Sequence, residues 1–259
     1  MKKFFKYIAV FIGLLLLFSA IGATIWWNSK SDRKKSDLFV DFMDYESAIE
    51  YDPTNSNAWM ERSVHFNKSG DFQQGFEYLD KAVELNPELH LGYRGWIRLR
   101  KLRDFDKALA DFEQLDNMTQ NVVDAPWGED IDFLRGECYF GNKEYDEAIE
   151  YFNRSIKNQK EDWADVQTFV YLGICEFKMD NFEKAILEFK RALAQSENVC
   201  EAHFGMAKAY DKIGEVKLAK VHILKAEGNI TYKRDDFYNE YLNEIYLSEI
   251  LDFKNYLEK

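Results

Sequence analysis

Apolar side chains recur along most of this chain at the spacing of an amphipathic helix. In "RGECYFGNKEYDEAIEYFNRSIK", residues 135–157, Ala148 has Tyr145 three residues before it and Phe152 four residues after it. These offsets place all three side chains on one helical face. The 259 residues include only three prolines and 13 glycines. Because so few residues would break a helix, the pattern predicts a mostly helical protein.

The same trio of a large, a small and a large residue returns at intervals. Strong copies are Phe105–Ala108–Phe112 and Phe182–Ala185–Phe189, and weaker ones are Val216–Ala219–Ile223 and Phe72–Gly75–Leu79. Successive small residues are 33, 40, 37 and 34 positions apart. A period near 34 predicts repeated pairs of antiparallel helices. One pair cannot bury its own apolar face, so neighbouring pairs must stack.

The stretch before each trio carries marks of a first helix. "RGECY" contains Gly136, "YLGICEF" contains Gly173, and "NAWMERSVHFNKSGDF" begins near Trp59. With Pro87 after the second helix, these residues resemble the tetratricopeptide repeat (TPR) family over residues 37–227. The resemblance implies an all-α, TPR-type α-solenoid of about five helix-turn-helix repeats. In the second copy, "LGYRGWIRLRKLRDF", the first helix is out of register by one residue.

Segments outside the repeats complete the predicted domain organisation. We expect a basic N-terminal tail at 1–6, a transmembrane helix at 7–27, a basic linker at 28–36 and a capping helix at 228–259. "SDLFVDFMDYESAIEYDP" resembles the second helix of an incomplete unit. The 40-residue spacing predicts an inserted loop at 116–130, with Pro126 and Gly128.

Residues 7–27, "YIAVFIGLLLLFSAIGATIWW", contain no charged side chain. As a helix they would extend roughly 31 Å, which matches the hydrocarbon core of a bilayer. The run continues past the small residues that a signal peptidase would need, so an uncleaved anchor is favoured over a cleavable signal peptide. The very short basic tail places the body on the outer side of a single-pass membrane protein. Cleavage would instead leave a secreted protein.

Charge and motifs narrow the function classes. The net charge is −12, although the first 35 residues carry seven basic groups and only one acidic group. The acidic remainder repels phosphate backbones, so we expect no nucleic-acid partner. No catalytic, metal-binding or cofactor-binding motif occurs, so the sequence predicts no enzyme and no cofactor. The histidines are dispersed, and Cys138 and Cys175 fill equivalent small-residue positions, which favours packing roles.

The TPR resemblance implies a concave groove lined by the first helices, and this groove is the expected site for a partner peptide or helix. Carried onto this chain, the inward-facing positions are Met60, Val64, Phe133, Phe140, Val170, Ile174, Phe177, Phe204 and Lys208. The alternative is that the C-terminal helix, or tight coiling of the solenoid, covers this apolar stripe. Arg94, Arg98 and Lys101 form a separate basic patch. Internal pairing with nearby carboxylates is favoured there over contact with an acidic peptide or lipid headgroups.

We therefore expect a membrane-anchored protein-interaction scaffold whose groove binds another protein. The alternative is a structural or regulatory subunit of a cell-envelope assembly that makes contact through loops and edges, with the insertion at 116–130 as the contact. The sequence does not name the partner.

Overall fold

Paired α-helices make up the protein in the computed structural model, which describes residues 2–120, 122–232 and 240–259, without the side chains of 2–10 and 13. No strand occurs among these residues. The chain divides into two units, Met1–His90 and Leu91–Lys259, called unit 1 and unit 2. The predicted all-α arrangement of helix pairs is confirmed.

Unit 1 holds a long N-terminal helix and two helix pairs. Its helices are α1 (Lys2–Asn28), α2 (Asp32–Asp41), α3 (Tyr45–Tyr51), α4 (Ser56–Ser69) and α5 (Phe72–Leu85). The stretch that was expected to supply only the second helix of an incomplete unit forms two short helices, α2 and α3. Met43 turns the chain between them with a left-handed backbone (φ 60°), and the Asp44 carboxylate then accepts a hydrogen bond from the Ser47 N–H at 3.2 Å to start α3.

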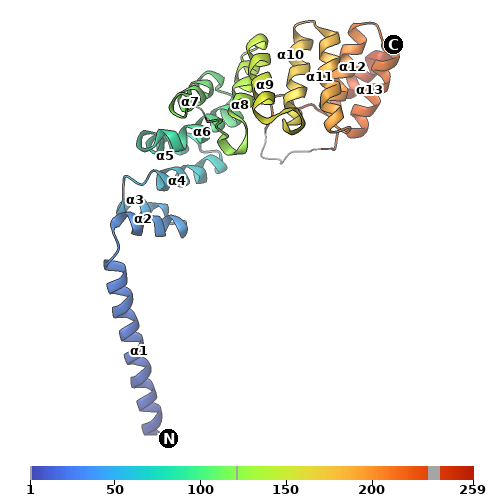
Figure 1. Cartoon of the computed structure of the whole chain (residues 1–259). Helices are drawn as coiled ribbons and strands as arrows, with labels where there is room; N and C mark the ends of the chain where they lie inside the picture. The colour runs from blue at the N-terminus through green and yellow to red at the C-terminus, as the bar shows by residue number, and fades with distance from the viewer. Residues whose placement is uncertain (1, 121, 233–239) are drawn as a thin grey trace. The chain divides into compact units, whose positions relative to one another are not determined.

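Unit 2 continues the series, and α6 (Pro87–Ile97) crosses the boundary between the units. The further helices are the π-helix η1 (Arg98–Leu102), α7 (Phe105–Met118), the 3₁₀ turn η2 (Pro126–Gly128), α8 (Ile131–Gly141), α9 (Tyr145–Gln159), the 3₁₀ turn η3 (Glu161–Trp163), α10 (Val166–Lys178), α11 (Phe182–Gln195), α12 (Cys200–Lys212), α13 (Val216–Asn229) and α14 (Leu247–Glu258). Helices α10 to α13 stand side by side in chain order (Figure 1).

One turn geometry joins the two helices of each pair. The residue two positions before the second helix adopts a left-handed backbone, at Met43, Gly70, Arg103, Lys143, Asp180 and Gly214. The next residue then serves as the N-cap of the second helix. Only two of these six positions are glycine, so the others accept the steric cost of a left-handed conformation. The backbone conformation of these turns therefore repeats along the chain, as the side-chain pattern does.

Phenylalanine rings packed on glycines hold the pairs together in unit 2. A Cβ added to Gly136 would lie 2.6 Å from the Phe152 ring, and one added to Gly173 would lie 2.5 Å from the Phe189 ring. The Phe189 ring also approaches Gly205, in the first helix of the next pair, where an added Cβ would lie at 2.3 Å. The small residues of the trios, Ala108, Ala148, Ala185 and Ala219, have no exposed surface. The small residues of the trios are thus buried, and the rings of the second helices fill the space left by the glycines of the first helices.

The π-helix η1 absorbs the one-residue shift in the second copy. A π turn holds one residue more than an α turn, so the helix accommodates the extra residue without losing its backbone hydrogen bonds. Gly95 still meets the Phe112 ring, where an added Cβ would lie at 2.7 Å. The shift also turns Arg100 inward, and its side chain is completely buried.

Part of the insertion at 116–130 packs on helix α6. Pro126 is buried against Gly92, and the Trp127 ring lies 4.9 Å from the Tyr93 ring centroid. Trp127 has a left-handed backbone (φ 59°). Val122 and Val123 stay exposed.

The C-terminal region was predicted as one helix over 228–259, but helix α14 begins at Leu247. Residues 240–246 are not helical, and Phe237, which falls within the predicted capping helix, lies outside the described residues. Helix α14 packs on α13 and buries Ile250 and Leu257.

The N-terminal helix corrects one prediction. Among the described residues, no helix combines the length and the apolar character that a bilayer crossing demands. Residues 7–10 and 13 lie outside the described side chains. The predicted single-pass localisation, with an extracytoplasmic body, is therefore wrong.

Trp27, near the end of α1, packs edge-on against Phe39 of α2 and Tyr51 of α3, with ring centroids 5.6 and 5.7 Å apart. The ammonium nitrogen of Lys30 lies over the neighbouring Trp26 ring, 4.0 Å from the ring centroid.

The glycine–ring contact gives a direct test of the fold. Gly136→Ala gains helix propensity of up to about 1 kcal/mol but forces a Cβ into the Phe152 ring, which costs about 1–3 kcal/mol. We expect a net loss of about 1 kcal/mol in the free energy of unfolding, measured by urea denaturation. Gly228→Ala in α13 is the matched control, because its added Cβ meets nothing within 4 Å and should be neutral or stabilising. Equal stability of the two variants would contradict the packing described.

Candidate partner-binding surface

The first helices of unit 2 present one face, which we call the first-helix face and which is formed by η1, α8, α10 and α12. Phe133, Val170 and Phe204, predicted as groove residues, are buried on these helices. Phe140, Ile174, Phe177 and Lys208 remain partly exposed. Met60 and Val64 are partly exposed on α4, in unit 1.

Lys208 lies over two aromatic rings of the first-helix face. Its ammonium nitrogen is 4.2 Å from the Phe204 ring centroid and 5.7 Å from that of Phe177. Burial lowers the pKa of Lys208, and the nearby charge of Lys178 lowers it further, whereas Glu249 acts in the opposite sense. This part of the face therefore combines an apolar strip with a partly desolvated cation.

The C-terminal segment of the chain occupies another part of the same face. The Tyr241 ring packs edge-on against Phe133 and Tyr171, with centroids 6.2 and 6.4 Å apart. It also lies 4.8 Å from the Arg100 guanidinium carbon. Further along, the Phe253 ring of α14 meets Phe204, with centroids 6.0 Å apart. At Phe133 and Phe204, therefore, the C-terminal region covers the predicted groove, as the alternative interpretation expected.

A buried ionic network lies beneath Tyr241. Arg100 donates to Glu137 of α8 and to Glu129, each at 2.5 Å, and the Tyr171 hydroxyl donates to Glu137 at 2.6 Å. The Trp96 indole donates to Glu129 at 2.8 Å. Removing one partner from such a buried network is costly, because it leaves an uncompensated charge.

Burial and charge act against each other in this network. Burial raises the pKa of Glu137 to about 7, although the Arg100 charge pulls it down. Burial also works against the Arg100 charge, but the carboxylates of Glu137 and Glu129 outweigh it and raise the Arg100 pKa. The sequence pattern did not single out Arg100 or Glu137, and the only signal was the extra residue in "RLRKLR" that produces the π turn.

The predicted basic patch is paired internally. Arg94 and Arg98 both contact the buried Asp111 carboxylate, at 2.8 and 2.6 Å, and Lys101 contacts Glu240 at 2.6 Å. The favoured expectation of pairing with neighbouring carboxylates matches this geometry. Lys101 therefore contributes to the contact with the C-terminal segment.

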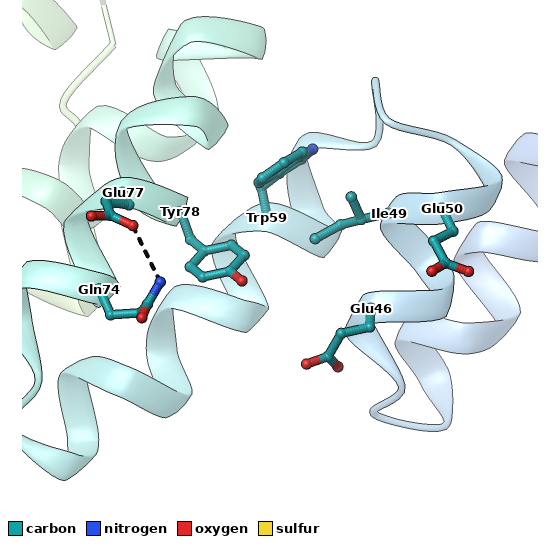
Figure 2. Close-up of a pocket in the computed structure, with 7 residues that line it drawn as sticks. All are labelled: Glu46, Ile49, Glu50, Trp59, Gln74, Glu77 and Tyr78. Carbon is teal, nitrogen blue, oxygen red and sulfur yellow. Dashed lines mark hydrogen bonds between the residues drawn. The ribbon is translucent and has the colours of Figure 1, made fainter.

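Unit 1 contains an acidic, aromatic cleft of about 420 Å³. Figure 2 shows Ile49, Trp59 and Tyr78 beside Glu46 and Glu50 of α3. The Trp59 and Tyr78 ring centroids are 5.8 Å apart. Carboxylates beside aromatic faces suit a cationic side chain, although Glu46 already pairs with Arg62. Neither Met60 nor Val64 lines this cleft.

Two histidines that are dispersed in sequence meet within the last helix pair. The Nδ1 atoms of His203 and His222 are 3.0 Å apart, and His203 Nε2 lies 3.0 Å from the Glu197 carbonyl oxygen. The carbonyl can only accept, so the neutral His203 carries its proton on Nε2 and accepts from His222. The pair borders a cavity of about 660 Å³ that is also lined by Lys190 and Lys225. No group of three metal-ligating side chains occurs in the described part of the chain.

Both histidines favour the neutral form. Burial lowers the pKa of His203, and this effect outweighs the hydrogen bond to the Glu197 carbonyl, which raises the pKa. Burial, followed by the neighbouring His203 and two lysines, lowers the pKa of His222 to about 4.

The pH dependence of stability tests this pair. Between about pH 6.5 and 4 these histidines are protonated in the unfolded chain but largely neutral in the folded protein. The free energy of unfolding therefore falls as the solution is acidified. For these partly solvated rings we expect His222→Gln to remove about 1–2 kcal/mol of the loss between pH 7 and 5. His65→Gln, at an exposed site, is the control. Denaturant titrations with parallel pH slopes for wild type and His222→Gln would refute the pairing.

Comparisons with known proteins agree on the architecture. A family model described as the tetratricopeptide repeat matches residues 133–162. Tetratricopeptide repeat protein 16 of Homo sapiens is 25% identical over 62% of this chain and 19% of its own length. BBSome complex member BBS4 of Bos taurus is 23% identical over 72% of this chain and 34% of its own length. The chain thus spans only 19% and 34% of the length of these two relatives.

Solved structures show the same fold at low sequence identity. PilW, a type IV pilus biogenesis factor, matches with a TM-score of 0.60 and 17% identity, over 78% of this chain and 94% of its own. YrrB, a TPR protein with an unusual peptide-binding site, matches with a TM-score of 0.56 and 16% identity, over 71% of this chain and 91% of its own. The chain therefore carries a tetratricopeptide repeat at residues 133–162, within an all-α solenoid of the TPR type.

Proposed function

We propose that this protein is a protein-interaction scaffold whose first-helix face binds a peptide or helix of a partner protein. One observation carries the proposal: Ile174, Phe177 and Lys208 form a partly exposed strip on α10 and α12. Apolar side chains beside a partly desolvated cation form a surface that gains by being covered.

Two further facts support this function over an enzymatic one. YrrB, a solved neighbour, is described by its peptide-binding site, and this chain shares its fold. On the first-helix face, Arg100 is held in an ion pair with Glu137, and Lys208 lies over the Phe204 ring. These contacts shape a surface, and they do not form a nucleophile with its base.

A second candidate surface is the insertion at 116–130. Val122, Val123 and Trp127 expose 60%, 55% and 57% of their surface. Exposed apolar residues on one loop favour contact with another protein through that loop. This surface corresponds to an assembly subunit that makes contact through loops and edges.

Replacing strip residues tests the proposed function. Phe177→Glu together with Lys208→Glu should reduce capture of specific partners at least tenfold, because the double change removes an aromatic contact and reverses a charge. The measurement is quantitative affinity capture of the full-length tagged chain after crosslinking in its native cells. Leu187→Glu on α11, where Leu187 is 58% exposed, is the control.

Unchanged capture by the Phe177→Glu, Lys208→Glu variant would overturn the proposal. If Trp127→Ala removed the same partners, the insertion would be the contact surface instead. A matched loss in Leu187→Glu would also count against the first-helix face, because the effect would not be specific to the strip.

A further inference from the structure

The chain's own residues 240–243 lie on the first-helix face as a bound peptide would. Glu240 pairs with Lys101 at 2.6 Å, and Tyr241 lies on Arg100, Phe133 and Tyr171. The Leu242 N–H donates to the Tyr171 hydroxyl at 2.8 Å. The Asn243 amide donates to Gln167 at 2.9 Å. One short non-helical stretch therefore makes a separate contact with η1, α8 and α10 at nearly every residue.

The contacts of residues 240–243 are of the kind that bind a peptide to a protein surface, more than the kind that pack a hydrophobic core. Tyr241 and Leu242 keep partly exposed side chains, and the Glu240 side chain is 47% exposed. The segment is held by an ion pair, a ring on a guanidinium, a main-chain donor and a side-chain amide. Helix α14, in contrast, is anchored by the buried Ile250 and Leu257. Residues 240–243 can therefore leave the face without removing the apolar anchor of the C-terminal helix.

The receiving side is held together by contacts that do not involve the segment. Arg100, Glu137 and Tyr171 are fully buried and bonded to one another. Their positions are fixed by the π turn in η1 and by the stacked helices α8 and α10. A preformed polar floor lowers the ordering cost of binding, because few of its side chains need to be rearranged.

We propose that this part of the first-helix face recognises an extended partner segment carrying an acidic residue, an aromatic residue and, two positions later, an amide residue. The chain's own Glu240, Tyr241 and Asn243 hold that place until such a segment displaces them. The charges agree with this ligand: Lys101 meets the acidic residue, and Arg100 lies under the aromatic ring. The proposal rests on the proposed scaffold function and names the chemistry of the partner and a self-occupied state.

The test is a competition between the resident segment and a free peptide. The probe is a fluorescein-labelled synthetic peptide with the sequence of residues 240–246, EYLNEIY, and its binding to the full-length chain is followed by fluorescence anisotropy. Tyr241→Ala with Asn243→Ala weakens the resident segment and leaves the face intact. We expect the Kd for the probe to fall at least tenfold relative to the wild type.

Matched variants separate this effect from general loosening of the C-terminus. Asn255→Ala with Tyr256→Ala removes the same two residue types from exposed positions of α14 and should bind the probe as weakly as the wild type. Adding Gln167→Ala to the Tyr241→Ala, Asn243→Ala variant should raise the Kd again. A probe with alanine in place of its first tyrosine, which corresponds to Tyr241, should not bind.

A second variant covers the case in which the double variant fails to fold. Leu242→Pro keeps both recognising side chains but removes the N–H that donates to Tyr171, and it should also tighten probe binding. Equal probe affinity for the wild type and for every folded tail variant would overturn the proposal. A wild-type mass that doubles with concentration and falls on probe addition would also overturn it, because the occupant would then be a second copy of the chain.

The result is independent of the capture experiment on the strip. Tight probe binding by the tail variants, with partner capture insensitive to Phe177→Glu and Lys208→Glu, would retain the peptide site and remove the strip from the binding surface. Sensitive capture with no gain in probe affinity would retain the scaffold function and remove the self-occupied state.

Discussion

The packing of phenylalanine rings from the second helices on glycines of the first helices is the contact on which the rest of unit 2 depends. The missing Cβ at Gly95, Gly136 and Gly173 leaves room for a whole ring, so the two helices of a pair approach closely and the ring is buried. The Phe189 ring also touches Gly205 of the next pair, which links one pair to its neighbour. Once this stacking is fixed, the outer side chains of the first helices lie at regular intervals on one face. The candidate binding surface follows from that packing.

The π turn at Arg98–Leu102 changes what this surface can do. One extra residue in the first helix leaves the glycine–ring contact at Gly95 in place but brings Arg100 into the interior. A buried guanidinium must be paired, and Glu137 and Glu129 supply the charges. The network extends through Tyr171 to the backbone of Leu242. An apolar solenoid face thereby gains a polar floor, and the floor binds the chain's own C-terminal segment.

The sequence predicted the elements that depend on local spacing and missed those that depend on distant residues. The small residues such as Ala148 and Ala185 are buried where the repeat placed them, and the pairs around them have the predicted order. The position of Tyr241 could not be predicted, because its neighbours Arg100, Phe133 and Tyr171 lie far away in the sequence and no periodicity connects them. The His203–His222 contact has the same cause, since it crosses between the two helices of one pair. The apolar run at residues 7–27 led to a wrong prediction. Its composition suggested a membrane span, but no helix among the described residues meets the requirements of one. Trp27, at the end of the run, packs on Phe39 and Tyr51 instead.

The central claim is that residues 240–243 dock on the first-helix face through specific side-chain pairs. A double-mutant cycle between Gln167→Ala and Asn243→Ala, with the free energy of unfolding measured for all four chains, tests this contact directly. A coupling energy of about 0.5–1.5 kcal/mol is the predicted result, because one buried amide–amide hydrogen bond is lost in either single variant. Strict additivity of the two single variants, with a coupling near zero, would contradict the docking.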